Sequence, residues 1–398
     1  MTSIAPLEGI RVLDLSTMIA APTCSTVLAD YGAEVIKVEN PGAGDHVRNF
    51  GRKKDGESLY WRALGRGKKS VALNLKDESV QELIRDWIKT FDVLIENFRP
   101  GTLEKWNLDP ADLQAINPRL VVLRVTAYGQ SGPYSERPGF GTLAEAMSGL
   151  PSLTGWEDRP PLLPPLPLAD IMAGHQGASA VLAALRQRDA HSGDTASIID
   201  LAIFESVLKL VEVNVIEYDQ LGVEYARRGN VYGAAAPRGS YLCKDGSWVA
   251  LSGSTQRTAM NLLRTIGGSE LENDSRFATN ETRLENVDAL DEIIGAWCSS
   301  RPRSVVIETL SDSGCAVGPL ESIPTMIENP QVRYRQSIAP VDDPVLGEVR
   351  MTNIYPHFSN WEPEPISPGA PEVGADTESV LAEDFGDDWK ERIDRTRS

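Results

Sequence analysis

The chain has 398 residues, of which 41% are hydrophobic and 24% charged, as in a globular protein with a sizeable buried core. Its formal net charge of −18 argues against nucleic acid and anionic membrane as partners. No run approaches the roughly 20 apolar residues of a membrane span. The first residues lack the basic and apolar regions of a signal peptide, so we expect a cytoplasmic protein.

The first third of the chain alternates strand and helix patterns. Helices are predicted at 22–31, where Pro22 stands in the first turn and Gly32 follows the last, and at 77–90. Short apolar runs predict strands at 10–15, 33–38, 70–75, 92–95 and 120–125. Strands separated by helices predict a mostly parallel sheet that is covered on both faces.

The loop after the first predicted strand, residues 15–22, lacks the Gly-x-Gly-x-x-Gly pattern. Dinucleotide binding is therefore disfavoured, although the order of elements is Rossmann-like. The four cysteines and four histidines show no paired spacing, so neither a disulfide framework nor a metal site is expected.

A basic stretch at 48–69 contrasts with the acidic composition of the whole chain. Such a charge run is typical of a solvated loop. In an acidic protein it also fits a rim that faces an anion. The sequence leaves both interpretations open.

Asp170 lies between a proline-rich run at 160–167 and a small-residue helix that is predicted to reach Arg188. The prolines hold an extended approach, and the small residues allow other backbone to pack closely on the helix. An aspartate at a helix start can be an N-cap that accepts the first amide protons. It can also be a carboxylate nucleophile held at a rigid edge. The local sequence does not decide between these roles.

The rest of the chain indicates a smaller domain followed by a C-terminal segment. A hairpin is predicted from strands 240–243 and 248–251 around a Lys-Asp-Gly-Ser turn. Further helices are predicted at 170–188, 204–217, 256–266, 287–299 and 304–311, and further strands at 196–201 and 347–351. The expected domains are a large one at 1–220, a small one at 221–330 and a segment at 331–398 that returns to the large domain or to a partner subunit.

Several segments together resemble class III CoA-transferases of the CaiB/BaiF type, which include formyl-CoA and carnitine-CoA transferases. Each motif is weak alone, but their order and spacing over nearly the whole chain are specific. The matching segments are 6–15, 28–39, 95–101, 128–134, 138–141, the Asp170 segment and 314–332.

The resemblance implies an α/β fold with a Rossmann-like large domain and a smaller α+β domain, in ring-like chains that interlock as a homodimer. It implies that Asp170 attacks an acyl-CoA thioester and becomes a mixed anhydride. The CoA thiolate then forms an aspartyl-CoA thioester, and an acceptor carboxylate completes the exchange. Acyl-CoA and a small carboxylic acid are the expected partners; CoA is a substrate, and no tightly bound cofactor is expected.

The resemblance also carries CoA contacts onto Leu73, Lys76, Asn97, Phe98 and Lys105. The apolar side chains would face the adenine, and the lysines would pair with phosphate oxygens. Without the resemblance, Phe98 reads as core and Lys76 as an exposed helix start.

Two departures from the family pattern concern charged contacts to substrate. Where the formyl-CoA enzyme has a basic residue just after its third strand, this chain has Glu39-Asn40-Pro41. Arg48, after the next turn, is the candidate to take over its contact with CoA. Arg238, in the small-residue loop 227–239, can meet a distal substrate carboxylate or serve only the loop.

Two alternative functions remain at this point. The related α-methylacyl-CoA racemases use a histidine where this chain has Phe140, which cannot move a proton. Racemisation is thus disfavoured, and Phe140 and the adjacent Gly141 are expected to face the substrate instead. Gly141 replaces the acid of the formyl-CoA enzyme, so larger acyl groups or dicarboxylates are favoured over oxalate and formate. The second alternative is a non-catalytic acyl-CoA-binding protein in which Asp170 is only a cap.

Overall fold

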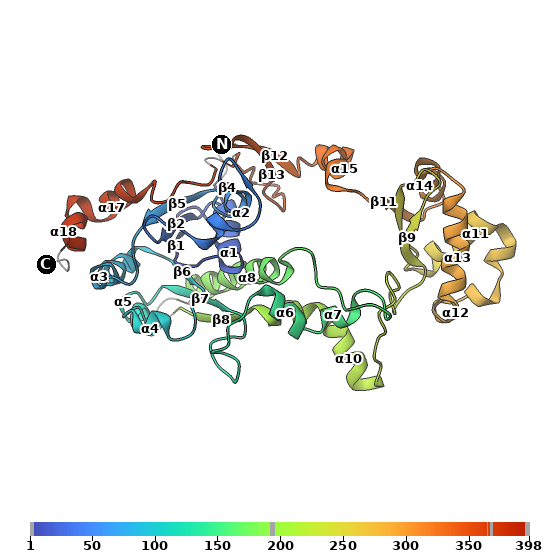
Figure 1. Ribbon diagram of the computed structural model, residues 1–398, viewed down its shortest axis with the longest axis horizontal. Coiled ribbons are helices and arrows are strands. Elements are labelled where there is room, and N and C mark those ends of the chain that lie inside the picture. The colour runs from blue at the N-terminus through green and yellow to red at the C-terminus, as the bar shows by residue number, and fades with distance from the viewer. Residues whose placement is uncertain (1–3, 192–195, 364, 367–368, 395–398) are drawn as a thin grey trace. The chain divides into compact units, whose positions relative to one another are not determined.

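The chain divides into two units, a large unit and a small unit, which are shown in Figure 1. The computed structural model describes residues 4–191, 196–363, 365–366 and 369–394. The large unit contains Met1–Pro151, Leu163–Gly222 and Tyr334–Ser398, and the small unit contains Ser152–Leu162 and Val223–Arg333.

A sheet of six parallel strands in the order β5-β2-β1-β6-β7-β8 is the centre of the large unit. The strands are β1 (Arg11–Asp14), β2 (Glu34–Glu39), β5 (Lys68–Ala72), β6 (Val93–Glu96), β7 (Val121–Thr126) and β8 (Ile198–Ala202). Adjacent residues of a strand enter different cores: Val12 joins one apolar cluster and Leu13 the other. The prediction of a parallel sheet buried on both faces is confirmed.

Helices on the two faces of the sheet complete the two apolar clusters. One face of the sheet packs against α1, α6, α8 and α9, and the other against α3, α4, α5 and α17 (Thr377–Phe385). Elements outside the sheet, up to residue 222, are α1 (Ala20–Asp30), β3 (Lys53–Lys54), β4 (Glu57–Ser58), α2 (Leu59–Leu64), α3 (Glu78–Trp87), α4 (Thr102–Lys105), α5 (Pro110–Ile116), α6 (Gly141–Met147), α7 (Leu150–Leu153), α8 (Leu168–Ala190), α9 (Ile203–Leu208) and α10 (Glu212–Leu221). Among the described residues, none of the helices is long and apolar enough to cross a lipid bilayer.

The small residues of α8 let α1 pack directly on its backbone. A Cβ added at Gly174 would lie 2.6 Å from Cγ2 of Thr23 and 2.8 Å from the carbonyl oxygen of Ala20. No side chain larger than hydrogen fits there. The predicted close approach of backbone to this helix is therefore confirmed.

The small unit contains a three-stranded antiparallel sheet in the order β11-β10-β9, and the predicted hairpin forms its β9 and β10. Its inner face packs with the helices around a separate apolar core. The elements after residue 223, up to residue 334, are β9 (Arg238–Leu242), β10 (Trp248–Ser252), α11 (Gln256–Glu272), α12 (Asn280–Glu285), α13 (Val287–Ser299), α14 (Arg303–Asp312), β11 (Ala316–Pro319), α15 (Ile323–Glu328) and α16 (Pro330–Tyr334).

The C-terminal segment packs on the large unit and covers β5, the edge strand of the parallel sheet. The Asp376 amide donates to the Ser70 carbonyl at 2.9 Å, and the Ser70 amide donates to the Asp376 carboxylate at 2.8 Å. The segment's elements are β12 (Ile338–Asp343), β13 (Gly347–Thr352), α17 (Thr377–Phe385) and α18 (Trp389–Asp394).

Candidate active site

A pocket of about 310 Å³ lies at the carboxyl ends of four strands of the parallel sheet. The chain leaves β1 toward one side of the sheet, to β2, and leaves β6 toward the other side, to β7. Such a switch point between neighbouring strands is where open α/β sheets bind ligands. The pocket is lined by Leu15, Ser16, Thr17, Val38, Glu39, Asn40, Ala43, Gly44, Asp45, His46, Leu73, Asn74, Leu75, Lys76, Phe98 and Trp106.

Three of the residues predicted to contact CoA meet in this pocket. Leu73 and Phe98 belong to its apolar wall, and Lys76 lies exposed at its rim. Phe98 packs edge to face on Trp106, with 5.0 Å between ring centroids. Trp106 could not be predicted from the sequence, because nothing in its neighbourhood distinguishes it from a core tryptophan. The pocket thus combines a flat apolar wall with a lysine at its mouth.

Asn97 does not line the pocket; it holds the turn that does. Its Nδ2 donates to the Thr17 carbonyl at 2.7 Å, and its Oδ1 accepts from the Thr17 amide at 2.8 Å. The next residue, Met18, has a φ of +69°, in the left-handed region that side chains rarely adopt. Asp45 stabilises this conformation by accepting the Met18 amide at 2.9 Å.

A buried ionic cluster of Asp14, Lys37, Asp45 and Lys68 stabilises the same turn. The Lys37 ammonium donates to the Ser16 carbonyl at 2.6 Å and lies 2.9 Å from an Asp45 carboxylate oxygen. Burial alone would raise the pKa of Asp14, but Lys37 and Lys68 outweigh it and hold that pKa at about 2. Asp14 is therefore ionised throughout the neutral range, and the cluster fixes the floor of the pocket.

The structure does not place Arg48 or Lys105 in the pocket lining. The Arg48 guanidinium pairs with both carboxylate oxygens of Glu39 and stacks 3.7 Å over Trp61, so we assign it no contact with CoA. Lys105 is exposed at the end of α4, one residue before Trp106, and its predicted phosphate contact stays a prediction. Glu39 therefore binds the arginine that was the candidate for the missing basic contact.

The basic stretch 48–69 has an exposed part, with Arg52, Lys53 and Lys54, and a buried part. Arg62, Arg66 and Lys68 are each less than 9% exposed. Each has a carboxylate partner far away in the sequence, at Asp343, Asp30 and Asp14 respectively, and Arg62 also pairs with the nearby Glu57. The charge run alone could not reveal these partners.

Asp170 is not the N-cap of α8. The helix begins at Leu168 after Pro167, so Asp170 is its third residue, and no side chain caps it at the Pro167 position. The amide of Ala169 instead donates to Oε1 of Glu145 on α6, at 3.1 Å. Because Glu145 satisfies a first-turn amide, the Asp170 side chain remains available for another role.

The Asp170 carboxylate packs against the first residue of α6. A Cβ added at Gly141 would lie 2.9 Å from the Asp170 carboxyl carbon, closer than real side chains approach. Burial, and then the charge of Glu145, raise the pKa of Asp170 to about 6. Among the described residues, no cation pairs with this carboxylate. Asp170 is thus a partly desolvated carboxylate that is still ionised at neutral pH.

Phe140 and Gly141, both predicted to face substrate, are brought beside Asp170. Phe140 precedes α6 and is 69% exposed. His175 lies further along α8, where its Nε2 is 3.5 Å from the Tyr355 hydroxyl. Gly141 therefore lies against Asp170, and no histidine is among the groups that affect the pKa of this carboxylate.

The pocket and Asp170 lie on the two sides of the start of α1. Thr17 lines the pocket, and Ala20, three residues later, contacts α8 at Gly174, one helical turn after Asp170. The start of α1 therefore connects the pocket lining to the helix that carries Asp170.

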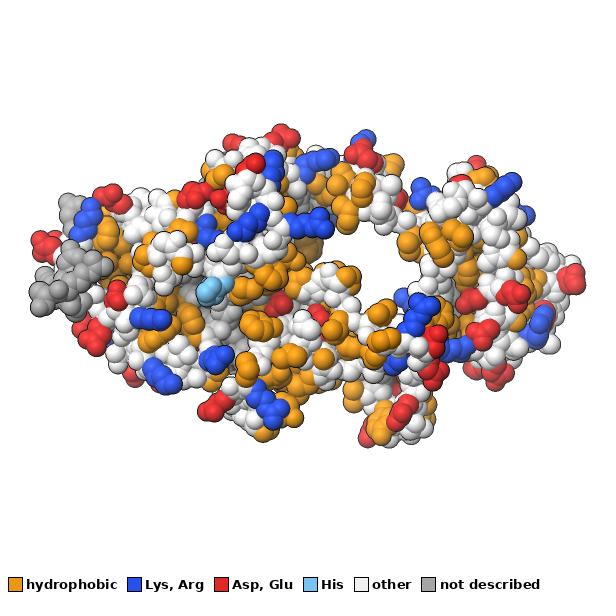
Figure 2. Space-filling model, viewed as in Figure 1, with side chains coloured by type: hydrophobic (Ala, Val, Ile, Leu, Met, Phe, Trp, Pro, Cys, Tyr) orange, Lys and Arg blue, Asp and Glu red, His pale blue; other side chains and the backbone are white. Residues whose placement is uncertain are grey.

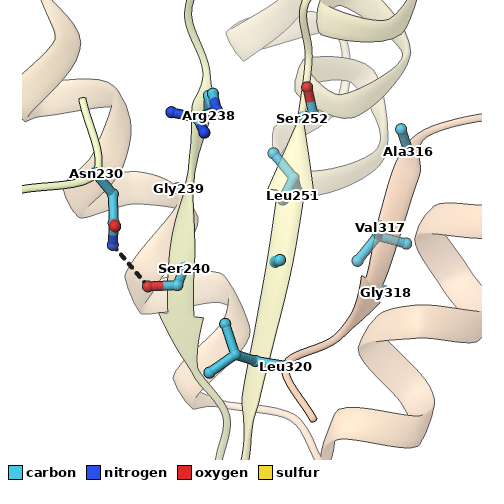
Figure 3. A pocket seen from close by; sticks show the side chains of 11 residues that line it. Asn230, Arg238, Gly239, Ser240, Leu251, Ser252, Ala316, Val317, Gly318 and Leu320 are labelled. Carbon is cyan, nitrogen blue, oxygen red and sulfur yellow. Dashed lines mark hydrogen bonds between the residues drawn. The ribbon is translucent and has the colours of Figure 1, made fainter. Parts of the chain in front are cut away.

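Arg238 lies in the small unit, at a separate pocket of about 540 Å³ on the outer face of β9, β10 and β11 (Figure 3). Its guanidinium lies 5.3 Å from the Tyr232 ring centroid. Asn230 donates to the Ser240 hydroxyl across the same pocket, at 2.7 Å. Arg238 is the charged residue of this lining, and its predicted contact with a substrate carboxylate stays a prediction.

A family model described as CoA-transferase family III matches residues 7–377. The chain belongs to this family. It is therefore an enzyme that transfers CoA, with CoA thioesters as substrates, and the resemblance seen in the motifs is confirmed.

Similar proteins agree with the family over most of the chain. A succinyl-CoA–D-citramalate CoA-transferase of Chloroflexus aurantiacus is 39% identical, covering 89% of this chain and 88% of the relative. The beta subunit of a succinyl-CoA–L-malate CoA-transferase from the same organism is 40% identical, covering 97% and 95%. The crystal structure of a CaiB/BaiF family protein from Brucella suis, 30% identical, superposes with a TM-score of 0.82 over 96% of this chain and 99% of that one.

Glu145, like Trp106, is a site residue that the sequence analysis did not identify. It is only 2% exposed, yet it stands in the apolar run Leu143-Ala144-Glu145-Ala146-Met147. A lone acid within such a run is a signal that a buried carboxylate has a specific partner.

Proposed function

We propose that this CoA-transferase works through acylation of Asp170. A carboxylate oxygen of Asp170 attacks the thioester carbonyl, the carbon–sulfur bond breaks, and CoA leaves as a thiolate. The thiolate then attacks the aspartyl carbonyl of the mixed anhydride and releases the first acid as a carboxylate. An acceptor carboxylate repeats the two steps in reverse order and departs as its CoA thioester.

The observation that carries this proposal is the state of the Asp170 carboxylate. It lacks a cationic partner among the described residues, and its pKa is raised to about 6. A carboxylate of raised pKa is more basic, and therefore more nucleophilic, than an ordinary aspartate, yet it remains ionised near pH 7. Partial burial also limits access of water, which would hydrolyse an anhydride.

We propose the switch-point pocket as the site of the CoA nucleotide. Phe98, Trp106 and Leu73 offer apolar and aromatic surface to the adenine, and Lys76 offers a cation to phosphate. The turn at Thr17 and Met18 separates this pocket from Asp170, so the pantetheine arm would pass over it.

We propose succinyl-CoA as donor and a dicarboxylate or hydroxydicarboxylate as acceptor. The two Chloroflexus relatives are named for succinyl-CoA with citramalate or malate. The absence of a side chain at Gly141 lets the Asp170 carboxylate pack against the start of α6. Arg238 is the cation that we assign to the distal carboxylate.

We propose that the chain works as an interlocked homodimer. Apolar side chains lie over α6 and α10 on the face seen in Figure 2, and α10 has no buried residue at all. Val213, Ile216, Tyr218 and Leu221 of α10 are each more than half exposed. Exposed apolar surface of this extent is typical of an interface.

The racemase alternative is not favoured by the site. Racemisation needs a second proton-transfer group across the α-carbon, and Phe140 occupies the place where the related racemases have histidine. The racemase would exchange the α-hydrogen of a 2-methylacyl-CoA for deuterium without any acceptor acid, whereas the transferase would not.

The proposal is tested by trapping the acyl enzyme. The enzyme is mixed with succinyl-CoA alone, treated with borohydride, digested and examined by mass spectrometry. We expect reduction of the thioester at Asp170, loss of trapping in Asp170→Asn, and loss of more than about 1,000-fold in turnover. Full activity of Asp170→Asn would overturn the nucleophile assignment.

A further inference from the structure

Glu145 is a buried carboxylate beside the proposed nucleophile, and the proposed reaction does not yet use it. It lies on α6 and is 2% exposed. Its Oε1 accepts the Ala169 amide at 3.1 Å, and no ion pair is found for it among the described residues. Burying a carboxylate without a cation is costly, so a purely structural acceptor would be better served by an amide.

The position of Glu145 connects it to both sides of Asp170. Through Ala169 it holds the first turn of α8, the turn that carries Asp170. Through its own helix it is joined to Gly141, on which the Asp170 carboxylate packs. A shift of Glu145 would therefore move the nucleophile and the surface against which it rests.

We propose that Glu145 is a positioning residue that drives acylation of Asp170. Its side chain fixes the direction of Asp170, and its negative charge disfavours a second carboxylate beside it. This inference rests on the proposed function.

The charge argument follows from the atoms that move. When Asp170 attacks the thioester, its negative charge ends on the departing sulfur, and the anhydride left at Asp170 is neutral. The aspartyl-CoA thioester is neutral as well. Glu145 therefore raises the free energy of the free Asp170 carboxylate relative to both acylated states. This difference favours acylation of Asp170.

The other charged side chains on α8 and on the elements packed against it either pair with residues other than Asp170 or are exposed. Arg188 near the end of α8 pairs with Asp92, Asp30 on α1 with Arg66, and Arg124 on β7 with Glu96. Asp200 on β8 accepts the Gln130 amide, and Glu205 on α9 is exposed. Burial and the charge of Glu145 are the two causes that raise the pKa of Asp170.

The test replaces the charge while keeping the shape. Glu145→Gln retains an oxygen for the Ala169 amide, and Glu145→Ala removes it. The Asp170 titration is followed by carbon NMR of enzyme labelled at the aspartate carboxyl carbon, with the signal assigned from Asp170→Asn. Glu205→Gln, an exposed acid on α9, is the matched control.

We expect the midpoint of the Asp170 signal to move in Glu145→Gln from about 6 toward the ordinary 3.8. We expect kcat to fall about 3- to 10-fold with KM for succinyl-CoA unchanged. Glu145→Ala should lower the melting temperature further, and Glu205→Gln should change none of these quantities.

An unchanged Asp170 midpoint and an unchanged kcat in Glu145→Gln would overturn the inference. If neither Glu145 variant folds, Glu145→Asp, which keeps the charge but shortens the reach, must keep the midpoint high while lowering kcat. The NMR midpoint does not depend on turnover. The inference about Glu145 can therefore be contradicted without contradicting the Asp170 nucleophile, which the trapping experiment tests.

Discussion

Asn97 binds the backbone of Thr17 at both its amide and its carbonyl, with hydrogen bonds of 2.8 and 2.7 Å. Asn97 follows β6 and Thr17 follows β1, so this pair joins the ends of the two strands that flank the switch point. The family resemblance assigned Asn97 to CoA itself. The structure gives it a supporting part, because it sets the shape of the turn that lines the pocket.

Replacing Asn97 should therefore affect CoA binding more than chemistry. We expect Asn97→Ala to raise KM for acyl-CoA about 5- to 20-fold, the cost of one to two hydrogen bonds, with a smaller change in kcat. Asn97→Asp keeps the acceptor for the Thr17 amide but places an oxygen against the Thr17 carbonyl, so it should bind CoA no better than Asn97→Ala. Steady-state kinetics would check this, and binding equal to the wild type in Asn97→Asp would contradict it.

Asp170 should make stability depend on pH in a defined direction. Its folded pKa, about 6, lies above the ordinary 3.8. Between these values the folded state holds more protons than the unfolded state, so this group's contribution is full below pH 3.8 and is lost as pH rises through 6. We expect Asp170→Asn to melt higher than the wild type at pH 7.5, with the difference closing as pH falls toward 4. A pH-independent difference in calorimetry would contradict the raised pKa.

Gly141 should be intolerant of a side chain only while Asp170 is present. The added Cβ of Gly141→Ala meets the Asp170 carboxyl group, so we expect a loss of kcat of tenfold or more and a lower melting temperature. In an Asp170→Gly background the same substitution should be nearly neutral in stability. A double-mutant cycle by thermal unfolding measures this coupling, and additive effects would contradict the contact.

Lys76 and Lys105 offer a matched pair of exposed lysines near the pocket. Lys76 lines its rim and Lys105 does not. We expect Lys76→Gln to raise KM for acyl-CoA about 3- to 10-fold and to weaken the salt dependence of binding, because a phosphate contact is lost. Calorimetric titration of the Lys76→Gln and Lys105→Gln enzymes with CoA would show which lysine contributes to binding. Equal losses of affinity in the two variants would support the Lys105 contact that the family resemblance implies.

Arg238 should decide between acceptors. We expect Arg238→Gln to reduce kcat/KM for malate about 10- to 100-fold and for a monocarboxylate of similar size by less than threefold, because only the former has a second carboxylate. Arg257→Gln, an exposed arginine of the same unit, is the control. An equal loss with both acceptors would indicate that Arg238 only supports its loop.

Much of the fold follows from local sequence. Apolar runs such as 120–125 identify fully buried strands, and Pro22 and Gly32 mark the ends of α1, because these signals act within a few residues. The strands of the parallel sheet moved by one to three residues; β5, predicted at 70–75, begins at Lys68. The strand begins with two lysines, and the sequence pattern did not predict them as strand residues. A charged residue inside a sheet can be predicted only when its partner is known. The helices were less exact, because the one predicted at 256–266 ends at Glu272 and the one predicted at 204–217 is divided into α9 and α10.

The site was harder to predict because its contacts are long-range. The family resemblance placed Asp170, Phe140 and Gly141 together. It could not show that Arg48 is bound by Glu39, or that Glu145 on one helix holds the amide of Ala169 on another. Residues 152–162 join the small unit for the same reason: Trp156 pairs with Arg228, more than seventy positions away.

The cover over β5 has a consequence for how the chain is made. The Ala72 amide on that strand donates to Thr377, 305 positions later. At roughly 5–20 residues per second, a ribosome needs about 15–60 s between the two. Throughout that interval the nascent sheet has an open margin that can recruit other strands, so synthesis itself exposes the chain to misassembly until its final helices emerge.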